Sequence, residues 1–214
     1  MEAKVNKKFL LPSLKGLSGK ICLCSSVQYI DSLPGIKAQL ENNGVEVVLF
    51  KSAHSNVPGQ ILGCDVSYVN SDFDAFLFVG DGMFHPKALL LKNEKKVFAF
   101  NPILGEVKEV VSSDIEKLRK RVKGRLLKFY DSKNIGILVS TKPGQHNMDK
   151  AIAFKLHFKD KNCFIFVDNE FNFSKLEDFN FIDCYVNTAC PRIGYDDSIR
   201  LEKPIINIGD VEWN

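Results

Sequence analysis

The stretch VNTACPRIGYDD, residues 186 to 197, places a cysteine where a strand should end. Cys190 follows a short apolar run and precedes Pro191, a pattern that predicts an exposed turn. Loops at the carboxyl ends of strands are where open α/β sheets hold their chemistry. A second stretch, PGQILGCDVS at residues 58 to 67, places Cys64 in a similar turn. Two loop thiolates suit a soft metal or an iron–sulfur cluster, although a free cysteine is more often a small buried residue.

The chain has six cysteines, and the other four lie within apolar runs: Cys22, Cys24, Cys163 and Cys184. Residues two apart in a strand share a face, so Cys22 and Cys24 should point into the same core. We expect all four to be packing residues. No pair has the CxxC spacing of structural zinc sites. Without a secretory signal, reduced thiols or metal ligands are favoured over disulfides.

Length and composition indicate a globular protein with a full core. The chain has 214 residues, 45% of them hydrophobic, and a net charge of +3. A basic run, KLRKRVKGR at residues 117 to 125, has no interleaved aromatic residues, so we interpret it as the solvated face of a helix rather than a nucleic-acid site. The sequence shows neither a signal peptide nor a membrane span, which predicts a cytoplasmic protein with no membrane partner and no direct nucleic-acid contact.

The order of elements predicts an α/β fold made of two similar small domains with parallel βαβ cores. We expect an N-terminal extension at residues 1–18, one domain at 19–110 and another at 111–214. Strands are expected at 20–26, 45–50, 75–79, 96–100, 134–140, 163–167, 181–186 and about 204–208. Helices are expected at 32–43, 86–92, between Val107 and Asp131, and at 147–160. Copies of one fold can point equivalent loops at a common axis, which would bring Cys64 and Cys190 together.

A set of motifs resembles the diphthamide synthase family: SSVQYID, PGQILGC, FLFVGDGMFHP, NPILGE, VSTKPGQ and NTACPRIGYDD. These enzymes transfer the 3-amino-3-carboxypropyl group of S-adenosylmethionine to a histidine of elongation factor 2. Family members have three similar α/β domains, and each domain offers one cysteine to a shared 4Fe-4S cluster. The resemblance covers the second and third domains, so it implies a truncated version of this three-domain repeat architecture. Cys64 and Cys190 then fall on the second and third cluster cysteines.

The resemblance also implies roles for polar residues at strand ends. In the VSTKPGQ turn, Ser140, Thr141, Gly144 and Gln145 would lie against the cosubstrate, with main-chain N–H groups free to meet a carboxylate or phosphate. A plain turn with glycine chosen for its backbone angles fits the same residues. Further candidates lie in the other motifs: Asp81 and Gly82 for the cosubstrate, Gln60, His85 as a proton carrier or a helix-start residue, and Arg192 as a counter-charge to the cluster.

Two functions follow from the resemblance. The leading hypothesis is a subunit or split part of the transferase, with a partner chain that supplies the missing first domain and its cysteine. The alternative is a non-catalytic companion that stabilises or reduces a full-length synthase. A two-lobed ligand-binding module without metal is a third possibility, permitted by fold analogy alone. A surface left by the absent domain should be apolar, and homodimerisation is one way to cover it.

Overall fold

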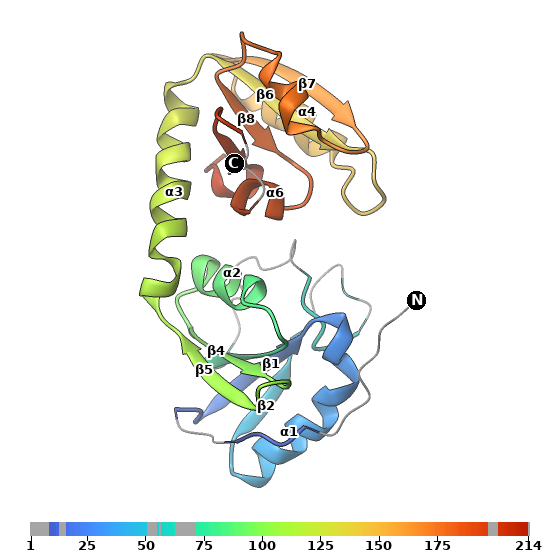
Figure 1. Cartoon of the computed structure of the whole chain (residues 1–214), viewed down its shortest axis with the longest axis vertical. Helices are drawn as coiled ribbons and strands as arrows, with labels where there is room; N and C mark the ends of the chain where they lie inside the picture. The colour runs from blue at the N-terminus through green and yellow to red at the C-terminus, as the bar shows by residue number, and fades with distance from the viewer. Residues whose placement is uncertain are drawn as a thin grey trace. The chain divides into compact units, whose positions relative to one another are not determined.

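The structure, a computed structural model, describes residues 9–12, 16–50, 55, 57–62, 72–196 and 201–213. The chain divides into two compact units, residues 1–116 and 117–214. Figure 1 labels most of the helices and strands of both. Each unit is built on its own sheet, so the two are described in turn.

The first unit contains a five-stranded sheet in the order β2-β1-β3-β4-β5. Four strands are parallel, and the last, β5, runs antiparallel to β4. The strands are β1 (Lys20–Ser25), β2 (Glu46–Leu49), β3 (Ala75–Val79), β4 (Lys96–Asn101) and β5 (Glu106–Val110). The helical elements are η1 (Val27–Ser32), α1 (Leu33–Asn42) and α2 (Phe84–Lys92).

Two cores cover the two faces of this sheet. Alternate residues of β1 point to opposite faces, so Ile21 and Leu23 pack with α1 whereas Cys22 and Cys24 pack with α2. All five residues of β3 are buried, because helices cover the strand on both sides. A continuous apolar run, rather than an alternating one, is therefore the pattern that this strand requires.

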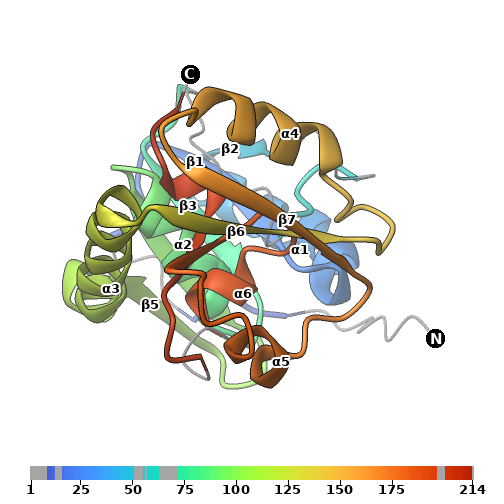
Figure 2. The ribbon, with the colours of Figure 1, turned by 90° about the horizontal axis from the view of Figure 1, so that it is seen from above.

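The second unit contains a four-stranded parallel sheet in the order β7-β6-β8-β9. Its strands are β6 (Asn134–Ser140), β7 (Asn162–Asp168), β8 (Cys184–Asn187) and β9 (Ile205–Asn207). Its helices are α3 (Ser112–Asp131), which begins in the first unit, α4 (Met148–His157), α5 (Phe173–Glu177), α6 (Arg192–Tyr195) and η3 (Ile208–Asp210). One core packs against α3 and α4 and the other against α5 and α6. Figure 2 shows α4 running alongside β6 and β7. The α/β class with parallel-sheet cores is confirmed.

Two elements begin later in the sequence than expected. The helix expected from Val107 begins at Ser112, because residues 106–110 form the antiparallel edge strand β5. Val107 and Val110 pack against opposite faces of the sheet, so the two valines fit an edge strand better than a helix. The strand expected from Phe181 begins at Cys184, and Phe181 is 51% exposed in the preceding turn.

The four cysteines that the sequence assigns to the core are confirmed as buried: Cys22, Cys24, Cys163 and Cys184. Burial raises the pKa of the Cys22 thiol and of the Cys184 thiol to about 12. Desolvation disfavours the thiolate, which is the form that binds metal. These thiols are therefore protonated at neutral pH and are poor ligands.

The raised pKa of the buried Cys184 thiol predicts that the free energy of unfolding falls at alkaline pH. Unfolding lowers the Cys184 pKa from about 12 to its ordinary value near 9, so above pH 9 the unfolded chain loses the proton first. The contribution of the protonated Cys184 thiol to the free energy of unfolding is complete below pH 9 and is lost as the pH rises toward 12. Between pH 8 and pH 10 the unfolding free energy of native protein should fall by about 1.4 kcal/mol more than that of Cys184→Ala.

Urea unfolding followed by fluorescence checks this value. The chain has one tryptophan, and Trp213 packs on Phe154 with ring centroids 5.2 Å apart, so its emission reports on the second unit. Cys22→Ala, in the first unit, is the matched control and should leave the pH dependence of the Trp213 transition unchanged. Equal pH dependence in native protein and Cys184→Ala would contradict the buried, protonated thiol.

Candidate functional site

Both sheets have a switch point, where the chain reverses the direction in which it adds strands. In the second unit it lies between β6 and β8, since the chain adds β7 on one side of β6 and β8 on the other. In the first unit it lies between β1 and β3 for the same reason. Open α/β sheets bind ligands outside the carboxyl ends of the strands at such points. The polar residues that follow β6 and β8 are thus the first candidates.

Cys190 lies at the carboxyl end of β8, three residues beyond Asn187, where that strand ends. Of the five cysteines that the structure describes, four are buried and Cys190 is partly exposed. A partly exposed thiol on a turn at a sheet's carboxyl edge is accessible to a metal ion or to a reagent. Within the described residues, Cys190 is the cysteine best placed to act as a ligand.

Two asparagines hold the main chain on both sides of Cys190. The side chain of Asn187, only 1% exposed, accepts a hydrogen bond from Ala189 N at 3.1 Å and donates to Cys190 O at 2.9 Å. It also donates to Asn207 Oδ1 at 2.8 Å, and Asn207 in turn donates to Pro191 O at 3.0 Å. Buried amides that are fully hydrogen-bonded fix one conformation of a turn. The position of the Cys190 thiol is therefore set from inside the sheet.

Hydrogen bonds from α3 hold the short helix α6, which begins just after Cys190. Arg125 donates to Gly194 O, and Arg121 donates to Tyr195 O at 3.2 Å. Partial burial lowers the pKa of Arg125 to about 10, which leaves it cationic at neutral pH. The Tyr195 hydroxyl donates to Asp210 Oδ1 at 2.8 Å. A Cβ at residue 194 would overlap the side-chain amide of Asn207, so glycine is needed where this helix meets β9.

The basic run at residues 117 to 125 is consequently not one solvated face. Lys117, Arg119 and Lys120 are exposed, as expected, but Arg121 and Arg125 are partly buried against α6. The expectation fails for these two because helix carbonyls at the end of α6 need donors.

The VSTKPGQ turn after β6 uses most of its own main-chain donors. Thr141 N donates to Asp168 O at 3.0 Å, Lys142 N donates to Ser140 Oγ at 3.1 Å, and Gln145 N donates to Lys142 O at 3.0 Å. The expectation that these N–H groups are free for a ligand is wrong for Thr141, Lys142 and Gln145, since the end of β7 and the turn itself accept their hydrogen bonds. Any recognition by Thr141, Lys142 or Gln145 must therefore come from side chains.

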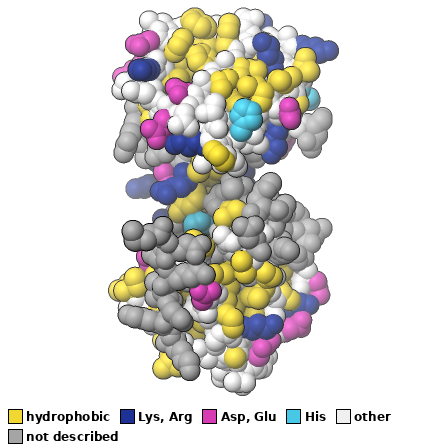
Figure 3. Space-filling model, turned by 90° about the vertical axis from the view of Figure 1, so that its right-hand side faces the viewer, with side chains coloured by type: hydrophobic (Ala, Val, Ile, Leu, Met, Phe, Trp, Pro, Cys, Tyr) yellow, Lys and Arg dark blue, Asp and Glu magenta, His cyan; other side chains and the backbone are white. Residues whose placement is uncertain are grey.

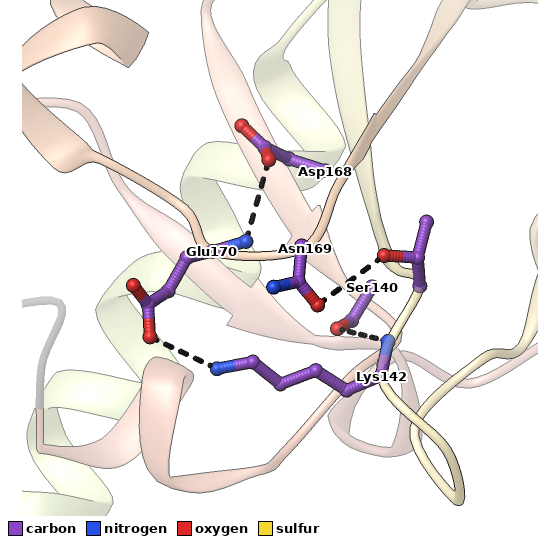
Figure 4. Close-up of polar contacts among 6 residues, drawn as sticks. Ser140, Lys142, Asp168, Asn169 and Glu170 are labelled. Atoms are coloured by element: carbon purple, nitrogen blue, oxygen red, sulfur yellow. Dashed lines mark hydrogen bonds and ion pairs between the residues drawn. The ribbon is translucent and has the colours of Figure 1, made fainter.

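The side chains of this turn form a polar cluster with the residues that follow β7 (Figure 4). Lys142 Nζ lies 3.1 Å from Glu170 Oε1, and both side chains are exposed. Thr141 Oγ1 donates to Asn169 Oδ1 at 3.4 Å, and Asp168 Oδ1 accepts from Glu170 N at 3.3 Å. The cluster presents both signs of charge at one edge of the sheet.

Gly144 shows why glycine follows Pro143 in this turn. Its φ of +75° lies in the left-handed region, which other residues adopt only with strain. No heavy atom lies within 4 Å of the position that a Cβ would occupy, so the turn is open there. The backbone angle alone accounts for the glycine, and close approach of a ligand is sterically permitted.

The structure brings the Ser140 turn and the Cys190 turn to the same edge of the second sheet. Asn147, just before α4, donates to Thr188 O at 2.8 Å, and the Thr188 hydroxyl donates to Leu138 O at 2.8 Å. These bonds join the end of β6 to the end of β8 across the switch point. Arg192 Nε pairs with Asp196 Oδ2 at 3.1 Å, and both side chains are exposed.

In the first unit, Asp81 and Gly82 follow β3 at the switch point, and Asp81 meets Tyr29 from η1. Burial of Tyr29 and its hydrogen bond to the Asp81 carboxylate raise the pKa of the tyrosine. Nearby, Gln60 forms an isolated parallel β-bridge with Ser25 of β1. The buried hydroxyl of Ser25 has no hydrogen-bond partner among the described residues. His85 lies in the first turn of α2 and stacks on Phe78 with centroids 5.4 Å apart, as a helix-start residue would.

Cys64 and Gly63 lie outside the described residues. In chain order Cys64 lies between β2 and β3, whereas Cys190 follows β8. That the two cysteines occupy equivalent loops stays a prediction. The described part of the chain has no group of three or more His, Cys, Asp or Glu side chains able to hold a metal ion.

Several residues that shape the site escaped the sequence reasoning: Tyr29, Asn147, Asn187 and Asn207. Asn187 and Asn207 carried a signal, since each is a polar residue at the end of an apolar strand. A buried amide at such a position needs several partners, which usually come from the following turn.

Comparisons with known proteins agree with the α/β fold of this chain. The family model of diphthamide synthesis proteins matches residues 2–213. The 2-(3-amino-3-carboxypropyl)histidine synthase of Pyrococcus horikoshii is 34% identical over 202 residues, which cover 93% of this chain and 58% of the relative. Subunit 1 of the corresponding synthase of Encephalitozoon cuniculi is 24% identical, over 94% of this chain and 58% of that protein.

A solved structure extends the comparison. Dph2 from Pyrococcus horikoshii with a 4Fe-4S cluster has a TM-score of 0.79 and 31% identity to this chain. The similarity covers 92% of this chain and 57% of that one, so the chain spans little more than half the length of these relatives. Within the described residues no helix is long and apolar enough to cross a membrane. The chain belongs to the diphthamide synthesis protein family.

Proposed function

We propose that this chain is a subunit or split part of the enzyme that makes the 3-amino-3-carboxypropyl derivative of a histidine in elongation factor 2. The group donor is S-adenosylmethionine, and a partner chain supplies the first domain and its cysteine. The partly exposed Cys190, fixed by Asn187 and Asn207 at the carboxyl edge of a parallel sheet, is the observation that supports this function most. Family membership and the named synthases support the reaction class.

The residues that are described fit one corner of a 4Fe-4S cluster. Cys190 offers an accessible thiol, whereas the four buried cysteines are packed into one core of each sheet. Arg125 and Arg121 donate to main-chain carbonyls of α6, the helix that follows the Cys190 turn, where their positive charge would suit an anionic cluster. We propose Cys64 as the second ligand and a cysteine of the partner chain as the third.

A bound cluster supplies the electron for reductive cleavage of a carbon–sulfur bond in S-adenosylmethionine. The chain's own residues would hold and orient that cosubstrate at the edge formed by β6 and β7. We propose that Lys142 binds the carboxylate of S-adenosylmethionine and that Glu170 binds its ammonium group. The two side chains form an ion pair of 3.1 Å in the structure, so they offer both signs of charge at one place. Ser140 and Gly144 keep the turn in shape, and Thr141 and Gln145 add hydrogen bonds. The resemblance also makes Asp81 and Gly82 of the first unit candidates for cosubstrate binding.

Co-expression tests this function. The chain purified anaerobically by itself should retain little iron, because two cysteines leave a cluster under-ligated. With a first-domain polypeptide it should give a brown complex that transfers a labelled aminocarboxypropyl group to elongation factor 2. A complex with no cluster and no transfer would end the proposal. If the chain has no transfer activity of its own but accelerates a full-length synthase, it is instead the non-catalytic companion.

A further inference from the structure

His146 is an exposed histidine at the carboxyl edge of the second sheet, and one of its ring nitrogens is held in place. Its Nδ1 lies 3.1 Å from the main-chain oxygen of Ser140, the last residue of β6. A carbonyl oxygen only accepts hydrogen bonds, so Nδ1 must be the nitrogen that carries a hydrogen. In the neutral ring, Nε2 then has no hydrogen and offers a lone pair. The fold therefore selects one tautomer of this imidazole.

The Nε2 atom of His146 has no hydrogen-bond partner among the residues that the structure describes. Histidine, coloured cyan in Figure 3, reaches the surface of the second unit. A carbonyl that holds one ring nitrogen while the other stays open is an arrangement in which histidine accepts a proton or binds a metal ion. In the described part of the chain, no group of three or more His, Cys, Asp or Glu side chains could hold a metal. The arrangement therefore favours a proton acceptor.

Two hydrogen bonds connect His146 with both turns of the candidate site. Its own ring holds the Ser140 carbonyl, at the start of the turn that we propose for the cosubstrate. The next residue, Asn147, donates to Thr188 O at 2.8 Å, and Thr188 lies two residues before Cys190. The imidazole is thus anchored at the switch point between β6 and β8, where open sheets bind their ligands.

Other ionisable groups of this edge are engaged with each other. Glu170 Oε1 pairs with Lys142 Nζ at 3.1 Å, and Asp168 Oδ1 accepts from Glu170 N at 3.3 Å. A carboxylate and an ammonium group held together in this way suit the binding of a zwitterionic amino acid. His146, in contrast, keeps an open proton-accepting atom.

The proposed reaction releases one proton. The name of the Pyrococcus horikoshii relative, 2-(3-amino-3-carboxypropyl)histidine synthase, describes a product with the new group on carbon 2 of the imidazole. For a histidine acceptor, a carbon–sulfur bond of the sulfonium donor breaks, a bond to carbon 2 forms, and the hydrogen on carbon 2 leaves. The sulfur departs as a neutral thioether and the hydrogen as a proton. The sum involves no net oxidation, so it requires a base but no external oxidant.

We propose that Nε2 of His146 takes this proton from carbon 2 of the acceptor histidine. The inference rests on the proposed function and adds a catalytic residue to it. The bond from Nδ1 to Ser140 O stabilises the imidazolium that forms, because a hydrogen bond to the charged form favours that form. Histidine is the side chain that most often transfers protons in catalysis, and a positioned base contributes about 10²–10⁴-fold to a rate.

Nitrogen NMR tests the tautomer on the full chain. In its neutral form, His146 should carry its hydrogen on Nδ1, whereas an imidazole free in water prefers Nε2. His157, also exposed, is the matched control, because its ring packs on Phe158 and Trp213 and forms no hydrogen bond to a main-chain oxygen within the described residues. A neutral His146 with its hydrogen on Nε2 would contradict the proposal.

Two substitutions separate the base from the hydrogen bond. His146→Asn keeps an N–H donor for Ser140 O but has no atom that takes up a proton, whereas His146→Ala loses both. In the co-expressed complex, each should lower transfer to elongation factor 2 by about 10²–10⁴-fold, while release of methylthioadenosine from S-adenosylmethionine continues. His157→Ala should transfer at the native rate. A fully active His146→Asn beside an inactive His146→Ala would reduce the role of His146 to its hydrogen bond.

Deuterium on carbon 2 of the acceptor histidine gives a readout that a structural role would not change. Without the base, loss of this hydrogen should become the slow step, so deuterium should slow transfer by His146→Asn more than transfer by the native complex. Equal isotope effects in the two complexes would overturn the assignment. A native complex that cleaves no S-adenosylmethionine would overturn the proposed function and this inference with it, whereas native transfer with a fully active His146→Asn overturns the inference alone.

Discussion

Replacing Cys190 by alanine should leave the complex of this chain and the proposed first-domain partner colourless. In the proposed cluster this chain contributes two thiolates, so the variant would remove one of them and leave an iron open to water and oxidant. Loss of a supporting residue around a metal commonly lowers affinity about 10- to 100-fold, and loss of a direct ligand should do more. Iron content and visible absorbance of the co-purified complex measure the effect. Cys64→Ala should give the same result.

Two other cysteines provide matched controls within the same unit. Cys163→Ala and Cys184→Ala remove thiols that are 6% and 0% exposed, and each should cost about 1 kcal/mol of unfolding free energy while iron is retained. Their sulfurs are part of the core against α3 and α4, and they lie at the amino-terminal ends of β7 and β8, whereas Cys190 lies beyond a carboxyl end. If Cys190→Ala and Cys64→Ala retain iron like these controls, the family relationship describes ancestry and fold but not the metal chemistry.

The sequence predicted the parallel sheets well because buried strands and amphipathic helices leave strong patterns. β3 is a continuous apolar run, and β6 is bounded by polar residues at both ends. β5 was missed because its sequence EVKEV has two charges between two valines and fits a charged helix equally well. Only pairing with β4 decides between the two, and pairing is a tertiary interaction that no local pattern contains.

The sequence also predicted which cysteine of the second unit is accessible, but not what holds it. Cys184 lies in an apolar run and Cys190 in a turn with proline and glycine, so their burial differs as expected. The bond from Asn187 to Asn207 joins two strands that are 20 residues apart in the sequence. Such a contact depends on the order β8-β9, which the spacing of the elements does not reveal.

Replacing Asn187 by alanine should have the largest effect on stability of any change near the site. The variant leaves Cys190 O, Ala189 N and Asn207 Oδ1 without the partner that Asn187 provides. Each buried polar group left unsatisfied costs about 1–3 kcal/mol, and partial access of water to the turn reduces the total, so we expect about 3 kcal/mol. Urea unfolding followed by Trp213 fluorescence measures it. Asn169→Ala, at an exposed position with one long hydrogen bond of 3.4 Å, should change stability by under about 0.5 kcal/mol.

The same variant separates a positioning role from simple stabilisation. If Asn187 fixes the thiol, then Cys190 of the metal-free, folded variant should react faster with an alkylating reagent than in native protein, as peptide mapping can measure. Asn207→Ala should act in the same direction, because it frees the main chain on the other side of Cys190 at Pro191. The two asparagines contact each other at 2.8 Å, so their effects should not add, and the double variant should be about 1 kcal/mol more stable than the sum predicts. Additive energies with unchanged alkylation of Cys190 would mean that the asparagines only support the sheet, and that some other contact sets the position of the thiol.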